Sequence, residues 1–284
     1  MNDNIRCLVE CCEEMKIPYQ ILHHTGNAVE VEIRNQGILF SNWATPLNPH
    51  SLARMCSDKE YSYEYFGRLI RMPRTMGFLD PDIEEDYRSY VHHANRSEIV
   101  DVIDSEFLYP LIVKRNSGSR GEHVYLCNQR EEVRESLDRI FTKGYKGYDY
   151  VGIAQEYIDI DSEYRVVYYR GTIEFLYQKL IGEIDKGGNV SPLHTVGSRA
   201  IRIKENEIQN ALKTFLQPIY DSTQLNFGGL DVALDVNGCW WLIEVNSAPS
   251  FSYFIRDNGD ADVLELYRKI LNDFRRNPCS EMIS

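Results

Sequence analysis

The chain has 284 residues, 43% of them hydrophobic, and a formal net charge of −12. This length and composition are those of a globular protein with a large core, and the negative charge disfavours a broad surface for nucleic acid while allowing a local basic pocket. No apolar run is long enough to span a membrane, and the odd number of cysteines, seven, argues for reduced thiols, so we expect a cytoplasmic protein with no membrane partner.

Apolar periodicity divides the chain into helices and strands, beginning with an amphipathic helix at residues 5–16. Further helices are expected at 49–70 (two helices meeting near Asp58), 81–107, 130–141, 206–220 and 261–274. Strands are expected at 19–22, 28–34, 37–40, 75–79, 111–114, 123–127, 153–158, 164–169 and 172–179, before a loop at 182–197 and a hairpin at 228–246. Strands outnumber helices in the second half and are mixed with them, which indicates an α+β fold.

The predicted hairpin near the C-terminus carries the clearest chemical signal. Two apolar runs flank an Asn-Gly pair, which is the strongest short hairpin signal. Asp231 and Glu244 then lie on adjacent strands, where a small shift of register decides whether they share a face, and Asn246 points the same way as Glu244. Carboxylate and amide oxygens on one face suit Mg²⁺, with Mn²⁺ as an alternative. Acidic hairpin residues more often form a solvated face, but a carboxylate in so apolar a strand is costly to bury without a partner or a metal.

A glycine-rich stretch follows the predicted strand that ends at Lys114. Its small residues include Ser117, Gly118, Ser119 and Gly121. Such residues let backbone N–H groups approach an anion closely, and Lys114 and Arg120 would supply positive charge to a phosphate. The spacing matches neither a Walker motif nor GxGxxG, so an ordinary turn with a solvated lysine explains this stretch equally well when it is taken alone.

The end of the predicted strand at 153–158 offers another binding element. Its last residues are Gln155, Glu156, Tyr157 and Ile158, whose backbone groups would suit an adenine edge. Glu163 and Arg165 follow, two residues apart and therefore on one face. The carboxylate suits ribose hydroxyls and the guanidinium suits a transferring phosphoryl group, although a cross-strand ion pair is the commoner outcome of this spacing.

Taken in chain order, these pieces resemble the ATP-grasp superfamily, and within it the RimK-type and glutathione-synthetase-like carboxylate–amine ligases. The resemblance spans residues 50–255 and rests on the order of Asp58-Lys59, Lys114 with its glycine-rich stretch, the 155–158 segment, Glu163-x-Arg165, Asp231 and Glu244-x-Asn246. Pieces in this order are far more specific than any one of them.

The resemblance implies an ATP-grasp fold in which two α/β lobes clamp ATP. It implies a shortened N-terminal domain at 1–74, a central lid subdomain at 75–155 and a C-terminal subdomain with the metal site at 156–284. By position, the implied roles are phosphate contacts for Lys59, Lys114, Ser117, Gly118, Ser119 and Gly121, an adenine hinge for Gln155, Glu156, Tyr157 and Ile158, a ribose contact for Glu163, catalysis for Arg165 and Lys114, and Mg²⁺ ligation for Asp231, Glu244 and Asn246.

The sequence also departs from the family pattern. In the loop at 182–197, the Arg and Asn of RimK-like members are replaced by Val190 and Pro192. Basic residues that are candidates to compensate are Lys179, Lys186, His194, Arg199 and Arg202. A family Pro-Gly is replaced by Pro249-Ser250, and the N-terminal domain is short, so part of the substrate platform is either missing or supplied by a partner.

The implied activity is that of an ATP-dependent carboxylate–amine ligase, which forms an amide or peptide bond through an acylphosphate and releases ADP and phosphate. The implied substrates are a small-molecule carboxylate and an amine, as an amino acid or peptide, and related enzymes are often dimers or tetramers, so a homo-oligomer is also expected. Two alternatives remain. A small-molecule kinase on this scaffold is disfavoured by the charge of −12, and an inactive nucleotide-binding scaffold is disfavoured by the intact Asp231, Glu244 and Asn246.

Overall fold

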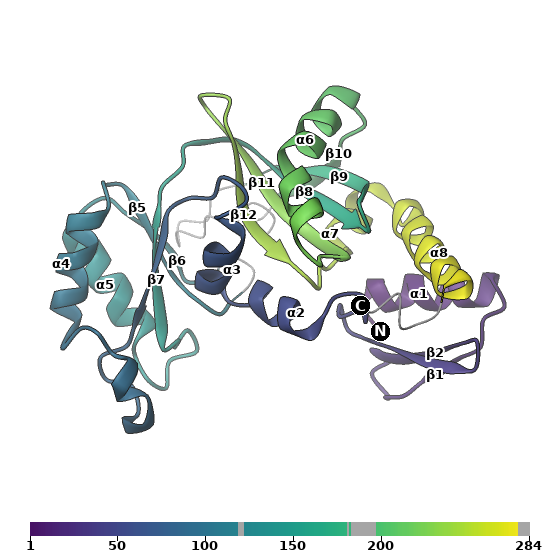
Figure 1. Cartoon of the computed structure of the whole chain (residues 1–284), viewed down its shortest axis with the longest axis horizontal. Coiled ribbons are helices and arrows are strands. Elements are labelled where there is room, and N and C mark those ends of the chain that lie inside the picture. Colours follow the sequence, from purple (N-terminus) through teal and green to yellow (C-terminus); the bar gives the residue numbers. More distant parts are fainter. Residues whose placement is uncertain (119–121, 181, 183–196, 278–284) are drawn as a thin grey trace.

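The computed structural model describes residues 1–118, 122–180, 182 and 197–277. These residues form three antiparallel sheets that follow one another along the long axis of the molecule (Figure 1). The first sheet has the strand order β1-β2-β3, the second β4-β7-β5-β6 and the third β10-β9-β8-β11-β12. The strands are β1 (Tyr19–Ile21), β2 (Ala28–Ile33), β3 (Gln36–Ser41), β4 (Thr75–Leu79), β5 (Leu111–Arg115), β6 (Val124–Cys127), β7 (Val151–Glu156), β8 (Ile160–Tyr169), β9 (Thr172–Leu180), β10 (Arg199–Arg202), β11 (Phe227–Asp235) and β12 (Trp240–Asn246).

Helices cover or connect these sheets. They are α1 (Asp3–Glu14), α2 (His50–Cys56), α3 (Lys59–Phe66), the 3₁₀ helix η1 (Glu85–Tyr90), α4 (Arg96–Glu106), α5 (Arg130–Ile140), α6 (Asn206–Ser222), α7 (Ser252–Asn258) and α8 (Ala261–Arg276). Among the helices of the described residues, none is both long and apolar enough to cross a lipid bilayer.

Side-chain caps explain where several helices begin. Asn2, Asp58 and Asn95 each accept a hydrogen bond from a backbone N–H in the first turn of α1, α3 and α4, at 3.1, 2.9 and 3.1 Å. The expected helical region at 49–70 is therefore two helices that meet at Asp58, as predicted. The region at 81–107 is less helical than predicted, because Asn95 has an extended backbone and starts a new helix after the short η1.

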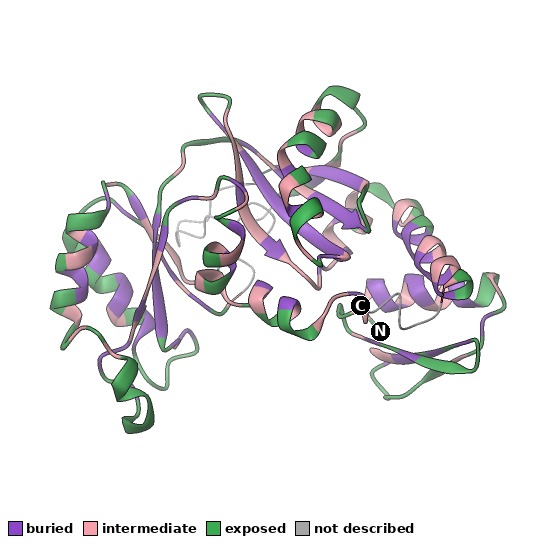
Figure 2. Cartoon of the chain, in the orientation of Figure 1, coloured by how far each residue is buried: buried purple, intermediate pink, exposed green. Residues whose placement is uncertain are grey.

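The two faces of the third sheet have different partners. On one face, Val166, Leu230 and Leu242 pack against buried residues of α6. On the opposite face, Val167 and Tyr169 pack towards α8. Figure 2 shows that the strands of this sheet are largely buried. Part of this second face carries charged side chains in place of apolar ones, and the candidate site lies there.

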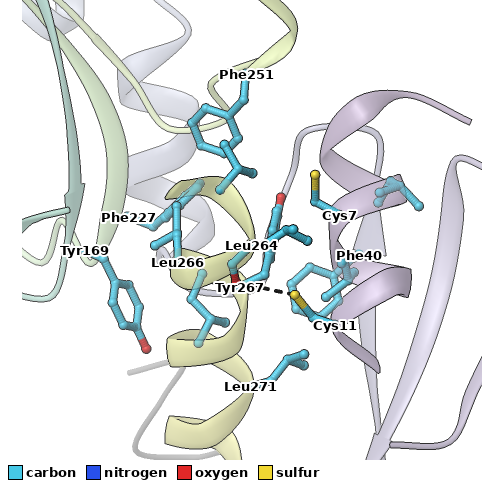
Figure 3. Close-up of a cluster of buried hydrophobic side chains, with 14 of the residues drawn as sticks. Cys7, Cys11, Phe40, Tyr169, Phe227, Phe251, Leu264, Leu266, Tyr267 and Leu271 are labelled. Carbon is cyan, nitrogen blue, oxygen red and sulfur yellow. Dashed lines mark hydrogen bonds between the residues drawn. The ribbon is translucent and has the colours of Figure 1, made fainter. Parts of the chain in front are cut away.

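The N-terminal segment shares a core with the third sheet. Figure 3 shows α8 between α1 on one side and the sheet residues Tyr169 and Phe227 on the other. Cys11 of α1 donates its thiol to the backbone oxygen of Leu264 at 3.4 Å, and both sides of the contact are buried. The short first sheet therefore packs, through α1 and α8, onto the same hydrophobic cluster as the third sheet.

Two elements were not predicted from the sequence, β10 and α7. They stabilise each other, because the Asp257 carboxylate accepts a hydrogen bond from the backbone N–H of Ala200 at 2.7 Å and the Asn258 amide donates to the backbone oxygen of Ala200 at 2.7 Å. Both elements are short and lack a clear period, so side-chain contacts that are distant in sequence decide their conformation. Most of the expected loop at 182–197 lies outside the described residues.

Candidate active site

A row of charged side chains crosses one face of the third sheet. Arg165 of β8 pairs directly with Asp231 of β11, and Asp231 pairs directly with Glu244 of β12. Residues that are directly opposite in antiparallel strands project to the same face. On the far side of Arg165, the row continues to Tyr177 of β9. The structure thus brings together, on one surface, three residues that the sequence placed in the site.

A β-bulge sets the register of this row. Near the turn of the hairpin, Leu234 pairs with Trp240, and this register would bring Ile243 opposite Asp231. The register shifts between Asp231 and Val232, so that Glu244 takes that position. Because a shift of one residue moves a side chain to the other face of a sheet, the bulge decides that the two carboxylates lie together.

The Asp231 carboxylate is held by two cations. Arg165 binds it with two nitrogens, with 2.8 Å between Nη2 and Oδ2, and Lys179 of β9 lies 2.8 Å from the same oxygen. Burial alone would raise the pKa of Asp231, but Arg165 and Lys179 outweigh it and hold this pKa well below its usual value. The carboxylate is therefore ionised and keeps the guanidinium in a fixed orientation.

Lys179 links this pair to the expected ribose contact, Glu163. Its ammonium group also forms an ion pair with the Glu163 carboxylate, and both side chains are largely buried. Burial raises the pKa of Glu163, while Lys179 opposes the rise. The cross-strand pairs in the structure are therefore Glu163 with Lys179 and Arg165 with Asp231. The sequence suggests Lys179 only as a replacement for a missing family residue, although it lies near the end of a buried strand, as Lys114 does.

Glu244 and Asn246 complete the expected metal set on this face. The Glu244 side chain is 36% exposed, and its Oε1 lies 3.9 Å from Lys59 Nζ. Asn246 pairs with Gly229, and its side-chain oxygen accepts a hydrogen bond from the backbone N–H of Ala248 at 2.9 Å. Within the described parts of the chain, no cluster of three or more His, Cys, Asp or Glu side chains could hold a metal ion. An ion here would need Glu244 and Asn246 together with one oxygen of Asp231, so metal ligation by these residues stays a prediction.

The second sheet presents a buried lysine towards the charged row. The Lys114 ammonium group donates to the side-chain oxygen of Gln155 at 2.8 Å, and the Gln155 amide donates to the Thr75 hydroxyl at 2.8 Å. Lys114 is only 8% exposed. Burial, reinforced by the charge of Lys59, lowers the pKa of Lys114 to about 8, while Glu244 raises it. Gln155, expected in the adenine hinge, thus orients the Lys114 side chain.

The start of α3 and the glycine-rich stretch hold each other in place. The Lys59 ammonium group donates to the backbone oxygens of Asn116 and Gly118, at 3.1 and 2.7 Å. The buried Asn116 side chain donates to the Asp58 carboxylate at 2.7 Å and accepts from the backbone N–H of Glu60 at 3.0 Å. We call these contacts the α3 clasp. The clasp places Lys59 beside Glu244, so it joins the second sheet to the charged row.

A buried aspartate supports the glycine-rich stretch from the other side. Asp149 accepts hydrogen bonds from the backbone N–H groups of Ser117 and Val151, at 2.6 and 3.1 Å. No local pattern in the sequence indicated this residue, because it lies 32 positions from Ser117. The expected contacts Ser119 and Gly121 lie outside the described residues.

The expected hinge connects the second and third sheets. The backbone N–H of Glu156 is already donated to the backbone oxygen of Arg74 at 2.8 Å. The hinge groups for a nucleobase edge are therefore those of Tyr157 and Ile158, which follow the last residue of β7. The backbone oxygen of the next residue, Asp159, accepts a hydrogen bond from the backbone N–H of Val236 at 3.0 Å. The hinge therefore runs beside the tip of the β11–β12 hairpin.

Comparisons with known proteins identify relatives of this architecture. The family described as YheC/D-like ATP-grasp matches residues 177–274, which include Lys179, Asp231, Glu244 and Asn246. No curated protein matches the sequence significantly.

Several solved structures resemble most of this fold. The ATP-grasp ligase PsnB superposes with a TM-score of 0.50 and 15% identity, over 78% of this chain and 62% of that chain. A bifunctional glutathione synthetase from Pasteurella multocida superposes with a TM-score of 0.60 and 12% identity, over 96% of this chain and 44% of that chain. D-alanine–D-alanine ligase from Bacillus anthracis superposes with a TM-score of 0.54 and 16% identity, over 80% of this chain and 68% of that chain. The chain therefore spans less than two thirds of the length of the first two proteins.

Proposed function

Since this chain has the ATP-grasp fold that its motifs predicted, we propose that it is an ATP-dependent carboxylate–amine ligase, which joins an acid and an amine into an amide or peptide bond. The observation that carries the proposal is the charged row on the third sheet, where Arg165, Asp231 and Glu244 lie side by side. Two lysines of the neighbouring elements, Lys59 and Lys114, complete a site with both cations and carboxylates around one surface.

ATP is the proposed nucleotide, bound between the second and third sheets. The fold supports this choice, because the similar ligase from Bacillus anthracis has been solved with ATP and PsnB with Mg and ADP. We assign phosphate contacts to Lys59, Lys114 and the backbone of Ser117 to Gly121, nucleobase contacts to Tyr157 and Ile158 of the expected hinge, and a ribose contact to Glu163. Glu244, Asn246 and Asp231 would hold Mg²⁺, which would neutralise phosphate charge during the transfer.

The proposed reaction has two steps, and Arg165 acts in both. The substrate carboxylate attacks the γ-phosphorus of ATP, so that an acylphosphate forms and ADP leaves. The amine then attacks the acyl carbon, and inorganic phosphate leaves. Negative charge develops on the transferring phosphoryl group and on the acyl oxygen. The Arg165 guanidinium, which Asp231 holds in a fixed orientation, would stabilise this charge without reorganising.

Hydroxylamine trapping tests this function directly. We would incubate the chain with ATP, Mg²⁺ and hydroxylamine, and supply amino acids and other small carboxylates one at a time. An ATP-dependent hydroxamate that Glu244→Ala no longer forms would support carboxylate activation and identify the acid. ADP release that depends on a hydroxyl compound, with no hydroxamate, would favour a kinase. A chain that binds ATP but turns over nothing would favour an inactive scaffold.

A further inference from the structure

The first turn of α1 holds the segment that follows the expected metal ligands. The Asn4 amide donates to the backbone oxygen of Pro249 at 2.9 Å, and its side-chain oxygen accepts from the backbone N–H of Phe251 at 3.0 Å. Asn4 is fully buried, and its amide also contacts the Tyr267 hydroxyl of α8. A single side chain from residue 4 therefore satisfies both backbone groups on either side of Ser250.

A second asparagine of the N-terminal segment fixes the other end of this region. The Asn48 amide donates to the backbone oxygen of Phe227 at 2.7 Å and lies 3.5 Å from the backbone oxygen of Ser247. Its side-chain oxygen accepts from the backbone N–H of Phe227 at 3.1 Å. Residues 247–251 are thus attached to the N-terminal segment at both ends.

Pro249, which Asn4 holds, and the Arg165 side chain both lie close to Gly229. Gly229 of β11 lies between them. A Cβ atom at Gly229 would lie 2.9 Å from Pro249 Cβ, 2.9 Å from Arg165 Cδ and 3.3 Å from Arg165 Nη1. The two 2.9 Å distances are shorter than real Cβ contacts, so only a glycine at position 229 leaves room for both Arg165 and Pro249.

We propose that Asn4 is a positioning residue for the catalytic arginine. It fixes Pro249, and Pro249 and Gly229 together confine Arg165 so that its guanidinium stays over Asp231. The inference rests on the ligase function proposed above. It gives the N-terminal segment a role in the site itself, because a residue of α1 fixes a neighbour of Gly229 and Arg165.

Three variants test this role. Asn4→Leu removes both hydrogen bonds at similar volume, and we expect it to lower kcat for hydroxamate formation by at least about tenfold, since a misplacement of about 1 Å costs about 100-fold. The KM for ATP should change less than about twofold, because Asn4 lies away from the hinge and the lysines. Gly229→Ala should lower kcat in the same way. In the double variant, the fold loss of kcat should be smaller than the product of the two single losses, because both changes displace the same contact between Pro249 and the Arg165 region.

Asn2→Ala is the matched control. It removes the cap of the same helix, with its 3.1 Å bond from Ile5, but leaves residues 249–251 untouched. We expect it to lower the melting temperature and to leave kcat unchanged. Equal losses of kcat in Asn2→Ala and Asn4→Leu, or fully multiplicative losses in the Asn4/Gly229 double variant, would mean that Asn4 only stabilises the fold, and the proposal would fail.

Hydrogen exchange provides a readout that needs no turnover. Asn4→Leu should lose protection at the amide of Phe251 and along 228–230 of β11, whereas Asn2→Ala should keep both. Unchanged exchange in Asn4→Leu would overturn the positioning role whether or not the chain is a ligase. A wild-type chain that forms no hydroxamate, with the exchange result intact, would instead overturn the proposed function and leave the structural link in place.

Discussion

Lys114 carries its ammonium group in an almost fully buried position at the end of β5. Burial and the nearby charge of Lys59 lower its pKa to about 8, so the side chain is mostly charged at pH 7 and mostly neutral at pH 9. A phosphate binds the charged form. We therefore predict that the KM for ATP, measured from pH 7 to 9.5, stays level at first and then rises above pH 8 by up to about tenfold per pH unit.

Lys114→Arg separates this titration from other effects of pH. Arginine stays protonated throughout this range, so the variant should show a higher KM at pH 7, because its geometry differs, but no rise above pH 8. The prediction is wrong if the wild-type KM is independent of pH, or if the arginine variant follows the same curve.

In the proposed reaction, Arg165 acts at a later stage than the lysines that bind ATP. Since Asp231 fixes its guanidinium, Arg165→Ala should lower kcat about 100- to 1,000-fold and change the KM for ATP only a few-fold. Steady-state kinetics with the acid found by hydroxamate trapping measure both constants. Arg134→Ala is the control, because Arg134 forms ion pairs with Glu131 and Asp138 of its own helix, α5, outside the charged row. A collapse of ATP binding with an unchanged rate at saturation would exclude the assigned role.

At the scale of elements, the α3 clasp connects a helix to the glycine-rich stretch. Asn116 donates to Asp58 and accepts from the start of α3, so Asn116→Asp removes a donor and sets two carboxylates against each other. A lost buried hydrogen bond costs about 1–3 kcal/mol. We predict that Asn116→Asp raises the KM for ATP by about tenfold, because the stretch that approaches the phosphates loses its support.

An exchange of the two side chains tests the clasp itself. Adding Asp58→Asn to Asn116→Asp restores one donor and one acceptor, and asparagine caps a helix as well as aspartate does, so the KM for ATP should return most of the way to wild type. Glu64→Ala, on the exposed side of α3, should leave this KM unchanged. Additive damage in the double variant would show that this hydrogen bond does not support nucleotide binding.

The elements of this chain differ in how far the sequence predicts them. Long periodic segments such as α5 and α8 have nearly the expected bounds, because an apolar face repeats along each of them. The hairpin was also predicted. No local pattern indicates its β-bulge, which brings Glu244 opposite Asp231. The short α7 depends on Asn258 and its distant partner Ala200, so no local pattern could indicate it.

The candidate site shows the same division between local and distant information. The order of motifs, which resembles that of the ATP-grasp superfamily, groups Asp231, Glu244 and Arg165, and the structure places them in one row. The sequence did not reveal that Lys179 shares Asp231 with Arg165, because the three strands β9, β8 and β11 must be arranged before that contact exists. Asn4 was equally invisible, since it lies 245 positions from Pro249.

At the scale of the whole molecule, the N-terminal segment and the third sheet share one hydrophobic cluster, to which α1 and α8 both contribute. The second sheet has a separate cluster with α4 and α5. The first and third sheets should therefore unfold together, even though the sequence suggests that the N-terminal segment is a domain of its own. The three tryptophans make this testable, because Trp43 follows the first sheet and Trp240 and Trp241 lie in the third.

We predict that Leu8→Ala, in the fully buried face of α1, destabilises both sheets by the same amount, about 2–5 kcal/mol. Denaturant titrations would follow Trp43 fluorescence in a background with Trp240→Phe and Trp241→Phe, and the other two tryptophans in a Trp43→Phe background. Leu137→Ala, the same change in the cluster of the second sheet, should leave both tryptophan transitions in place. If Leu8→Ala shifted the Trp43 transition alone, the N-terminal segment would be an independent unit, and a role for Asn4 in holding Pro249 would lose its physical basis.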